Sequence, residues 1–301
     1  MSLLVTGSIG IDTVETPHGR AADVPGGSAV YFSFAASLLT PVRLVGVVGE
    51  DFPDSFRRVF DGRPIDLAGL ETRRGSRTFR WHGRYEGDMN AAQSLRTDLN
   101  VLGERGPTIP PAFRDSRYVF LANTHPALQR DLLAQLTSPK LVVCDTMNLW
   151  IETALDELKQ TLAAVGGVVL NDGEARLLTG CNNLIDAGRA VLELGPRFVI
   201  IKKGEHGSLL VDGPDLFVLP AYPTREVRDP TGAGDSFAGG FMGWLAAHDR
   251  TDGAALRSAV ARGTVTASFT IEGFSLEGLA TATPAGVEAR LEHLRRCTRF
   301  E

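Results

Sequence analysis

The chain is poor in cysteine, carries no excess of positive charge and has no long apolar run. Its 301 residues include only three cysteines, Cys144, Cys181 and Cys297, and no CxxC pair. An odd number at such wide spacing disfavours a disulfide framework or a zinc site and is typical of a reducing compartment, so we expect a cytoplasmic protein. The formal net charge of −5 disfavours a protein that binds nucleic acid through general attraction to phosphates.

Signals for secretion and for membrane insertion are missing as well. The opening MSLLVTGSIGID has no basic leader and reaches a glycine at position 7, which predicts a first β-strand and not a signal peptide. No apolar run approaches the roughly 18 residues that a membrane-spanning helix needs. We therefore expect a small-molecule ligand, with neither a membrane nor a nucleic acid as partner.

Two common nucleotide-binding motifs are also lacking. There is no GxxxxGK followed by serine or threonine, which excludes a Walker-type P-loop. No GxGxxG follows the first strand, because GSIG lacks the spacing, so a nicotinamide-dependent oxidoreductase has little support.

Short apolar runs alternate with segments of helical period along the whole chain. This β–α alternation predicts a mostly parallel sheet with helices on both of its faces. The predicted strands are 3–6, 42–48, 117–122, 140–144, 167–170 and 197–202. The predicted helices are 28–39, 127–137, 153–165, 173–179 and 184–194.

Polar residues follow several of these strands. Asp12, Asn123 and Asp145 come after three of them, and Asn171 and Glu174 after a fourth. Strand ends need turn residues, so each one alone is more often structural. Because ligands of open parallel sheets bind beyond the carboxyl ends of the strands, the set together predicts a site at that edge.

The stretch TFRWHGRY, residues 78–85, breaks the rhythm. Aromatic residues and a glycine alternate in it with Arg80, His82 and Arg84, and this period of two predicts a strand with two different faces. A turn, EGDMN, follows. The hairpin is either a lid over a ligand or a solvent-facing edge of the protein.

The stretch DPTGAGDSFAGGFM, residues 229–242, carries most of the chemistry. Thr231 to Gly234 can turn the chain so that successive N–H groups point into one concavity, and the helix that follows adds its partial positive charge. Both features favour a bound anion. Asp235 is either a plain N-cap or a base that takes a proton from an attacking hydroxyl.

Residues 229–242 resemble the carboxyl-terminal signature of the ribokinase/pfkB family of carbohydrate and nucleoside kinases. The resemblance extends to PGGSAVYFSFAASLL (25–39), GVVGEDF (46–52), NDGEARLLTG (171–180) and IIKKGEHGSLL (200–210), and so to nearly the whole chain. It implies a ribokinase-like three-layer α/β/α fold with a mostly parallel central sheet and a small β lid. We expect one catalytic domain, residues 1–301, with the lid formed by about 11–20 and 75–98.

The resemblance also implies roles for individual residues. Asp235 would be the catalytic base, and the anion hole for the transferring phosphoryl group would be formed by Gly232, Ala233 and Gly234. The phosphate acceptor would meet Asp12, Gly26, Gly27 and Ser28, with the aromatic residues Phe79 and Trp81 above it. ATP would be lined by the segment that contains Lys202, Lys203, Gly204 and Gly207. Mg²⁺ would be organised through waters by Asn171 and Glu174, and a monovalent cation such as K⁺ by Asp229 and Thr231.

Some positions depart from the family pattern. Val30 and Tyr31 stand where the family usually has an asparagine after the di-glycine, and Lys202-Lys203-Gly204 stands where threonine-x-glycine is common. A lysine at the strand end either meets the ATP phosphates or is merely solvated.

The implied activity is an ATP-dependent kinase with an alcohol group as acceptor. GGS resembles the acceptor segment of adenosine kinases, and the aromatic strand could stack on a base, which favours a nucleoside. A sugar or sugar phosphate is the alternative, and Arg73, Arg74, Arg77, Arg80 and Arg84 could then hold a phosphate. A non-catalytic sensor on this fold is disfavoured by the intact Asp235. The assembly expected is a monomer or a homodimer through the lid.

Overall fold

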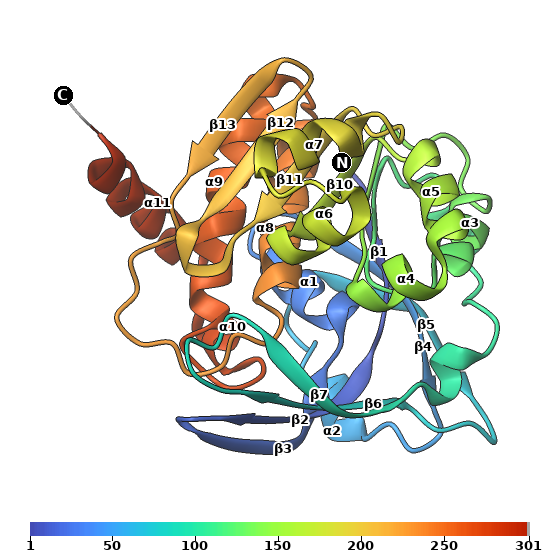
Figure 1. Cartoon of the computed structure of the whole chain (residues 1–301). Coiled ribbons are helices and arrows are strands. Elements are labelled where there is room, and N and C mark those ends of the chain that lie inside the picture. The colour runs from blue at the N-terminus through green and yellow to red at the C-terminus, as the bar shows by residue number, and fades with distance from the viewer. Residues whose placement is uncertain (300–301) are drawn as a thin grey trace.

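A nine-stranded sheet forms the centre of the computed structural model, which describes residues 1–299; residues 300 and 301 of the predicted domain lie outside that range. The strand order is β13-β12-β11-β10-β9-β8-β1-β4-β5, and all neighbours are parallel except β11–β12 and β12–β13 (Figure 1). The strands are β1 Leu3–Thr6, β4 Val42–Gly49, β5 Ile65–Arg73, β8 Tyr118–Leu121, β9 Leu141–Asp145, β10 Gly167–Asn171, β11 Phe198–Lys202, β12 Ser208–Asp212 and β13 Asp215–Leu219.

Helices cover both faces of this sheet, which confirms the predicted three-layer architecture. One face packs against α1 Ser28–Ser37, α8 Ala233–His248 and α9 Gly253–Thr270, with α10 Glu277–Thr281 and α11 Pro284–Thr298 beside them. The other face packs against α3 Pro126–Leu133, α4 Asn148–Thr153, α5 Leu155–Ala164, α6 Asp172–Thr179 and α7 Leu184–Leu192. The short elements are α2 Asp54–Arg58 and the 3₁₀ turns η1 Asn100–Gly103, η2 Pro111–Phe113 and η3 Gly204–His206.

All six predicted strands are confirmed, and the predicted helices differ mainly at their ends. The predicted helix 153–165 is divided: α4 ends at Thr153 and α5 begins at Leu155, with Ala154 outside helical geometry between them. The edge strands β5 and β13, and β12 beside β13, were not predicted. Polar residues interrupt the apolar pattern of β5, and the apolar runs of β12 and β13 are only three or four residues long.

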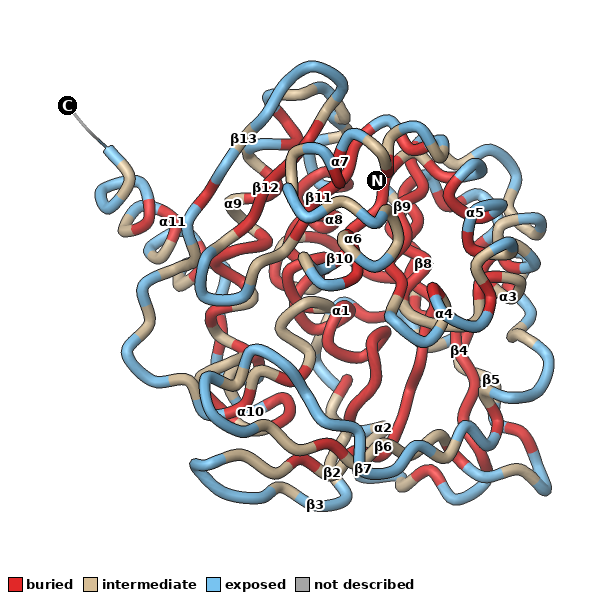
Figure 2. The backbone as a smooth tube through the Cα atoms, in the orientation of Figure 1, coloured by how far each residue is buried: buried red, intermediate tan, exposed pale blue. Residues whose placement is uncertain are grey.

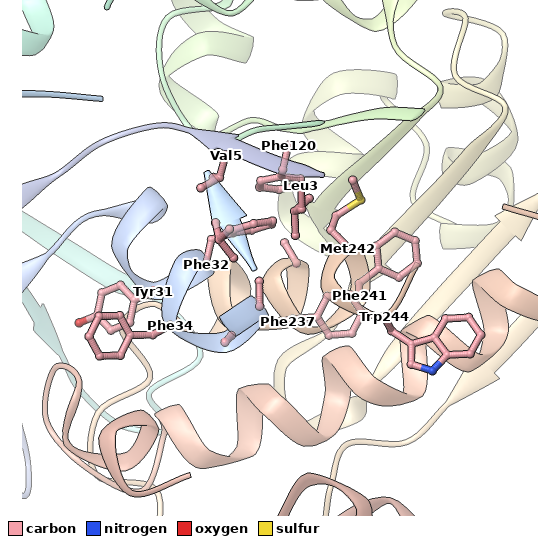
Figure 3. Packing of buried hydrophobic residues seen from close by; sticks show 14 of the residues in the cluster. Leu3, Val5, Tyr31, Phe32, Phe34, Phe120, Phe237, Phe241, Met242 and Trp244 are labelled. Carbon is pink, nitrogen blue, oxygen red and sulfur yellow. The ribbon is translucent and has the colours of Figure 1, made fainter. Parts of the chain in front are cut away.

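Helix α8 lies in the core between α1 and α9, and its glycines allow this close packing. A Cβ on Gly239 would lie 2.4 Å from the carbonyl oxygen of Phe32 on α1, and one on Gly240 would lie 2.0 Å from Oγ1 of Thr266 on α9. Phe237 and Phe241 of α8 are buried in the same cluster (Figure 3). Each fully buried side chain of this size contributes roughly 1.5–3 kcal/mol, so the helix is held rigidly.

A second, four-stranded sheet lies apart from the main one, and we call it the small sheet (Figure 1). Its order is β3-β2-β6-β7, formed by β2 Gly10–Thr16, β3 Gly19–Gly26, β6 Phe79–Tyr85 and β7 Ala92–Asp98. Both segments predicted for the lid are in it, although the first strand pair extends to residue 26 instead of about 20. Its outer strands β3 and β7 are mostly exposed (Figure 2).

The two faces of β6 differ as its alternation predicts. On one face Arg84 pairs with Glu15 at 2.7 Å, and His82 contacts the same carboxylate at 3.0 Å. On the other face the rings of Phe79 and Trp81 pack along the small sheet itself, against Gly10 and Gly83 respectively. The aromatic face is therefore formed from within the sheet.

Candidate active site

The start of α8 is shaped by Gly232, the residue just before the helix. Its φ is 74°, a left-handed conformation that favours glycine, and a Cβ there would lie 2.2 Å from the ring of Tyr31. No side chain caps the helix. The N–H of Ala233 donates to the carbonyl oxygen of Pro230 at 3.1 Å, whereas the N–H groups of Gly232 and Gly234 keep the capacity to bind an anion. Asp235 lies in the first turn and is not the N-cap, which removes the plain capping interpretation.

Lys202 at the end of β11 reaches this helix start. A Cβ on Gly234 would lie 2.6 Å from Nζ of Lys202, with the rest of the lysine chain beyond 3.5 Å. The ammonium group therefore lies against the first turn of α8. Burial raises the pKa of Asp235 from 3.8 to about 6, and the positive charge of Lys202 opposes that rise.

Asp145, at the carboxyl end of β9, belongs to the same cluster. Its side chain is buried, and Oδ1 has no hydrogen-bond partner. Burial raises its pKa well above the usual range; the charge of Asp235 raises it further, and Lys202 lowers it. Asp145 was noted in the sequence only as one of several polar residues after strands. Nothing in its local pattern separates it from an ordinary turn residue.

Asn171 and Glu174 form a reciprocal capping box at the start of α6. The backbone N–H of Glu174 donates to Oδ1 of Asn171 at 2.8 Å, and the backbone N–H of Asn171 donates to Oε2 of Glu174 at 2.7 Å. Glu174 is buried, which raises its pKa, while Lys202 lowers it. The pair thus has a structural role, and it also places a carboxylate beside Lys202.

Asp12 and the di-glycine form the opposite side of the site. A Cβ on Gly26 would lie 1.8 Å from Oδ2 of Asp12, and one on Gly27, where φ is 101°, would lie 2.4 Å from the carbonyl oxygen of Ser8. These two glycines therefore make room for the carboxylate and for the turn. Asp12 is 3 % exposed, and its Oδ1 has no partner.

Burial is the main cause of a large shift at Asp12. It raises the pKa from 3.8 to about 7; a hydrogen bond from the backbone of Gly27 opposes the rise, and the charges of Asp229 and Asp235 add to it. The carboxylates of Asp12 and Asp235 are therefore near enough to influence each other across the site.

Two residues of α1 lie beside Asp12. The Ser28 hydroxyl accepts the backbone N–H of Ser8 at 3.1 Å and lies 3.0 Å from the Ser8 hydroxyl. Tyr31 is 1 % exposed with an unpartnered hydroxyl. That hydroxyl points away from Phe237 and Phe241 (Figure 3). Ser28 is thus engaged within the protein, whereas Tyr31 presents a polar atom without a partner.

The small sheet reaches the site through Tyr85. Oγ1 of Thr231 donates to the Tyr85 hydroxyl at 3.4 Å. Burial raises the pKa of Tyr85 to about 12; the hydrogen bond from Thr231 opposes the rise, and nearby aspartates, Asp229 and Asp235 among them, add to it. On the same face Nε1 of Trp81 donates to Ser94 at 3.0 Å. Tyr85 is a site residue that the sequence reading grouped only with the lid aromatics.

The side chains of the adjacent lysines Lys202 and Lys203, at the end of β11, lie on opposite faces of the main sheet. Lys203 lines a surface groove with Arg176, Leu184 and Leu209, on the sheet face opposite α8. Gly204 has φ 53°, and a Cβ there would lie 2.4 Å from Oδ1 of Asn90 in the β6–β7 turn. The small sheet therefore also touches this loop.

Gly207 and Asp229 hold the loops around the site. A Cβ on Gly207, where φ is 80°, would lie 2.0 Å from the carbonyl oxygen of Leu219. Asp229 accepts the backbone N–H of Thr231 at 2.9 Å and that of Ser275 at 3.2 Å. Both Asp229 oxygens are thus already engaged with backbone.

Residues 1–299 contain neither a cluster of metal-binding side chains nor a membrane-spanning helix. Within that range no three histidine, cysteine, aspartate or glutamate side chains gather closely enough to hold a metal ion. In the same range no helix has the length and apolar character needed to cross a membrane. All three cysteines are free thiols.

Comparison with known proteins places this geometry in a family. The model of the pfkB family carbohydrate kinases matches residues 3–280. A cytidine kinase of Thermococcus kodakarensis is 31 % identical over 249 residues, which cover 80 % of this chain and 87 % of the relative. A nucleoside kinase of Methanothermobacter thermautotrophicus is 26 % identical over 90 % of this chain and 84 % of its own.

A solved structure shares the fold over almost the whole length. The nucleoside kinase of Burkholderia thailandensis in complex with inosine superimposes with a TM-score of 0.76 at 20 % identity, covering 97 % of this chain and 98 % of the other. The family match, the strand order and the glycine-rich start of α8 agree, and the chain belongs to the pfkB family of carbohydrate kinases, as an ATP-dependent phosphotransferase with the ribokinase-like fold.

Proposed function

We propose that the protein is a nucleoside kinase, which transfers the γ-phosphoryl group of ATP to the primary hydroxyl of a ribosyl substrate. The observation that carries this proposal is the half-buried Asp235 in the first turn of the uncapped helix α8, directly after Gly232 to Gly234. This arrangement brings a binding point for the phosphoryl group and a basic carboxylate, Asp235, together at the start of α8.

Asp235 is the catalytic base of the proposed reaction. It accepts the proton of the primary hydroxyl while that oxygen attacks the γ-phosphorus, and the bond to the β–γ bridging oxygen breaks to leave ADP. The N–H groups of Gly232 and Gly234, on either side of Ala233, hold the transferring phosphoryl group. Fixed dipoles at that point stabilise developing charge without reorganisation.

The acceptor lies against Asp12 and the neighbouring aromatic residues of the small sheet. Two buried polar atoms without partners, Oδ1 of Asp12 and the Tyr31 hydroxyl, lie on this side. Buried polar groups nearly always find partners, so both support a polyhydroxylated ligand. Gly26 and Gly27 make room for the Asp12 carboxylate and for the turn, and Ser28 shapes that turn through Ser8.

A nucleoside fits this site better than a sugar phosphate. Of the arginines that could hold a phosphate, Arg73 pairs with Glu71 at 2.9 Å, Arg80 with Asp23 at 2.8 Å, and Arg84 with Glu15. Phe79 and Trp81 offer an aromatic surface for a base. The relatives named cytidine kinase and nucleoside kinase add support from similarity.

In this proposal ATP binds along the loop after β11. Lys202, Gly204 and Gly207 lie beside the nucleotide, and Lys203 lies at the outer edge of the loop. The residues present fit a divalent cation carried by the nucleotide, because Asp145 and Glu174 supply carboxylate oxygens and Oδ1 of Asp145 has no partner. Bound Mg²⁺ would neutralise phosphate charge there, and Asn171 holds Glu174 in position.

The small sheet is proposed to act as a lid. It contacts the acceptor side through Tyr85 and the nucleotide loop through Asn90, whose Nδ2 lies 3.4 Å from Oε1 of Glu205. A cover in this position excludes the water that would otherwise compete with the acceptor hydroxyl. A monovalent cation such as K⁺ is proposed to lie by Asp229 and Thr231.

The test is ATP-to-ADP conversion with Mg²⁺ and a panel of cytidine, adenosine, inosine, ribose, fructose and fructose 6-phosphate, with and without K⁺. Turnover with one or more of the nucleosides is expected. Turnover with the sugars alone would replace the proposal by a sugar kinase, and no turnover despite ATP binding would remove it. The D235N variant serves as the negative control.

A further inference from the structure

The cluster around Lys202 is unbalanced in charge. The lysine at the end of β11 interacts electrostatically with Asp145 of β9, Glu174 of α6 and Asp235 of α8. The positive charge of one lysine thus lowers the pKa of three acidic side chains. All three are buried or half-buried, where uncompensated charge is costly.

The position of the ammonium group matters as much as its charge. Nζ lies 2.6 Å from the place where a Cβ of Gly234 would be, while Cε and Cδ are 3.6 and 3.9 Å from that place. The tip of the side chain therefore touches the helix turn whose N–H groups form the proposed anion hole. In the proposed reaction this is where the phosphoryl group is held while it is transferred.

We propose that Lys202 is a catalytic residue that pairs with the phosphoryl group as it moves into the start of α8, and so stabilises the transition state more than bound ATP. This inference rests on the proposed phosphotransfer. An interaction that strengthens along the reaction path raises kcat, whereas one made equally with bound ATP lowers KM alone.

Gly234 has a specific reason to be glycine under this proposal. Its φ lies outside the left-handed region, so alanine is tolerated by the backbone, and the three nearest atoms to an added Cβ all belong to Lys202. Because the nearest atom is the end of a flexible side chain, G234A should fold normally. It keeps the N–H donor and displaces only the ammonium group.

The experiment measures kcat and KM for ATP in wild type, K202M, K202R, K203M and G234A, with K159M, an exposed lysine of α5, as the neutral control. K202M should lower kcat at least about 100-fold with KM for ATP within about threefold, as for the loss of one transition-state donor. K202R should recover part of kcat. The kcat loss in K203M should be at least about tenfold smaller than in K202M, since its side chain lies on the other sheet face.

A double-mutant cycle tests the contact even if K202M is poorly stable. G234A should lower kcat in wild type and have no further effect in the K202M background. A rise in KM for ATP at unchanged kcat, equal losses in K202M and K203M, or additive effects of G234A would each overturn the assignment.

A binding measurement tests the role of Lys202 independently of which acceptor the enzyme uses. Calorimetric titration with ADP, with and without aluminium fluoride as a mimic of the phosphoryl group, needs no turnover. Aluminium fluoride should tighten ADP binding in wild type and much less in K202M. No difference between the two proteins would overturn the role of Lys202, whereas failure of the nucleoside panel alone would overturn only the acceptor.

Discussion

Replacing Asp12 by asparagine should stabilise the folded protein at alkaline pH while lowering its activity. The pKa of Asp12 is about 7 in the folded state, against 3.8 ordinarily. Between these values the folded protein holds a proton that the unfolded chain has released, so stability falls as pH rises from about 4 to 7 and the loss is complete above 7. At 1.36 kcal/mol per pH unit, the stability lost relative to pH below 4 is about 2 kcal/mol at pH 5 and about 4 kcal/mol at pH 8.5.

Urea unfolding of wild type and D12N at both pH values tests this reasoning. Asparagine has nearly the same shape and no charge, so D12N should be the more stable protein, by a margin that grows with pH. Its kcat/KM for a nucleoside should fall, because the acceptor loses a hydrogen-bond partner. D215N, which removes an exposed carboxylate on β13, controls for net charge. A D12N protein that is less stable than wild type at pH 8.5, or a margin independent of pH, would refute the argument.

Three further predictions concern the start of α8. D235N should retain the fold and lower kcat by at least about 10²-fold in a coupled ATP assay, because the base is lost; near wild-type turnover would disprove the assignment. The pH profile of wild-type kcat/KM should fall below about pH 6, where Asp235 gains a proton; a profile still flat at pH 5 would exclude this group as the base. G232A should be destabilised much more than G180A in thermal unfolding, because both glycines have φ near 73° yet only Gly232 lies against the Tyr31 ring; equal losses would mean that backbone strain alone matters.

The fold was largely predictable because its strands are buried on both faces. The strands β8 and β11, for example, are continuous apolar runs between helices of clear period, and such runs are the strongest signal in a sequence. The strand pair β2–β3 was only half predicted. Its members are held by pairing with each other and with β6, a contact about 70 residues away that no local pattern encodes.

The site was predictable where backbone geometry demands a residue type. The sequence GAGD marks the start of α8, and the di-glycine marks the space beside Asp12, since both need glycine. Asp145 was predicted only as one of several polar residues at the sheet edge and Tyr85 only as one of the lid aromatics, because their importance comes from burial beside Asp235, Asp12 or Lys202. Such burial depends on tertiary packing and leaves no mark in the local sequence.

The different positions of Lys202 and Lys203 also could not be predicted from the local sequence. Two adjacent lysines look equivalent in the sequence, but successive residues of a strand point to opposite faces. Lys202 therefore meets Gly234, while Lys203 lines the groove by α6 and α7.

The most direct test of the account is phosphorylation of a nucleoside by the purified protein, followed by comparison with D235N. The account predicts ADP and a nucleoside 5′-monophosphate in equal amounts from wild type, and very little of either from D235N. ADP formation with sugars but with no nucleoside would contradict the proposed acceptor. Undiminished nucleoside phosphorylation by D235N would contradict the mechanism built on the start of α8.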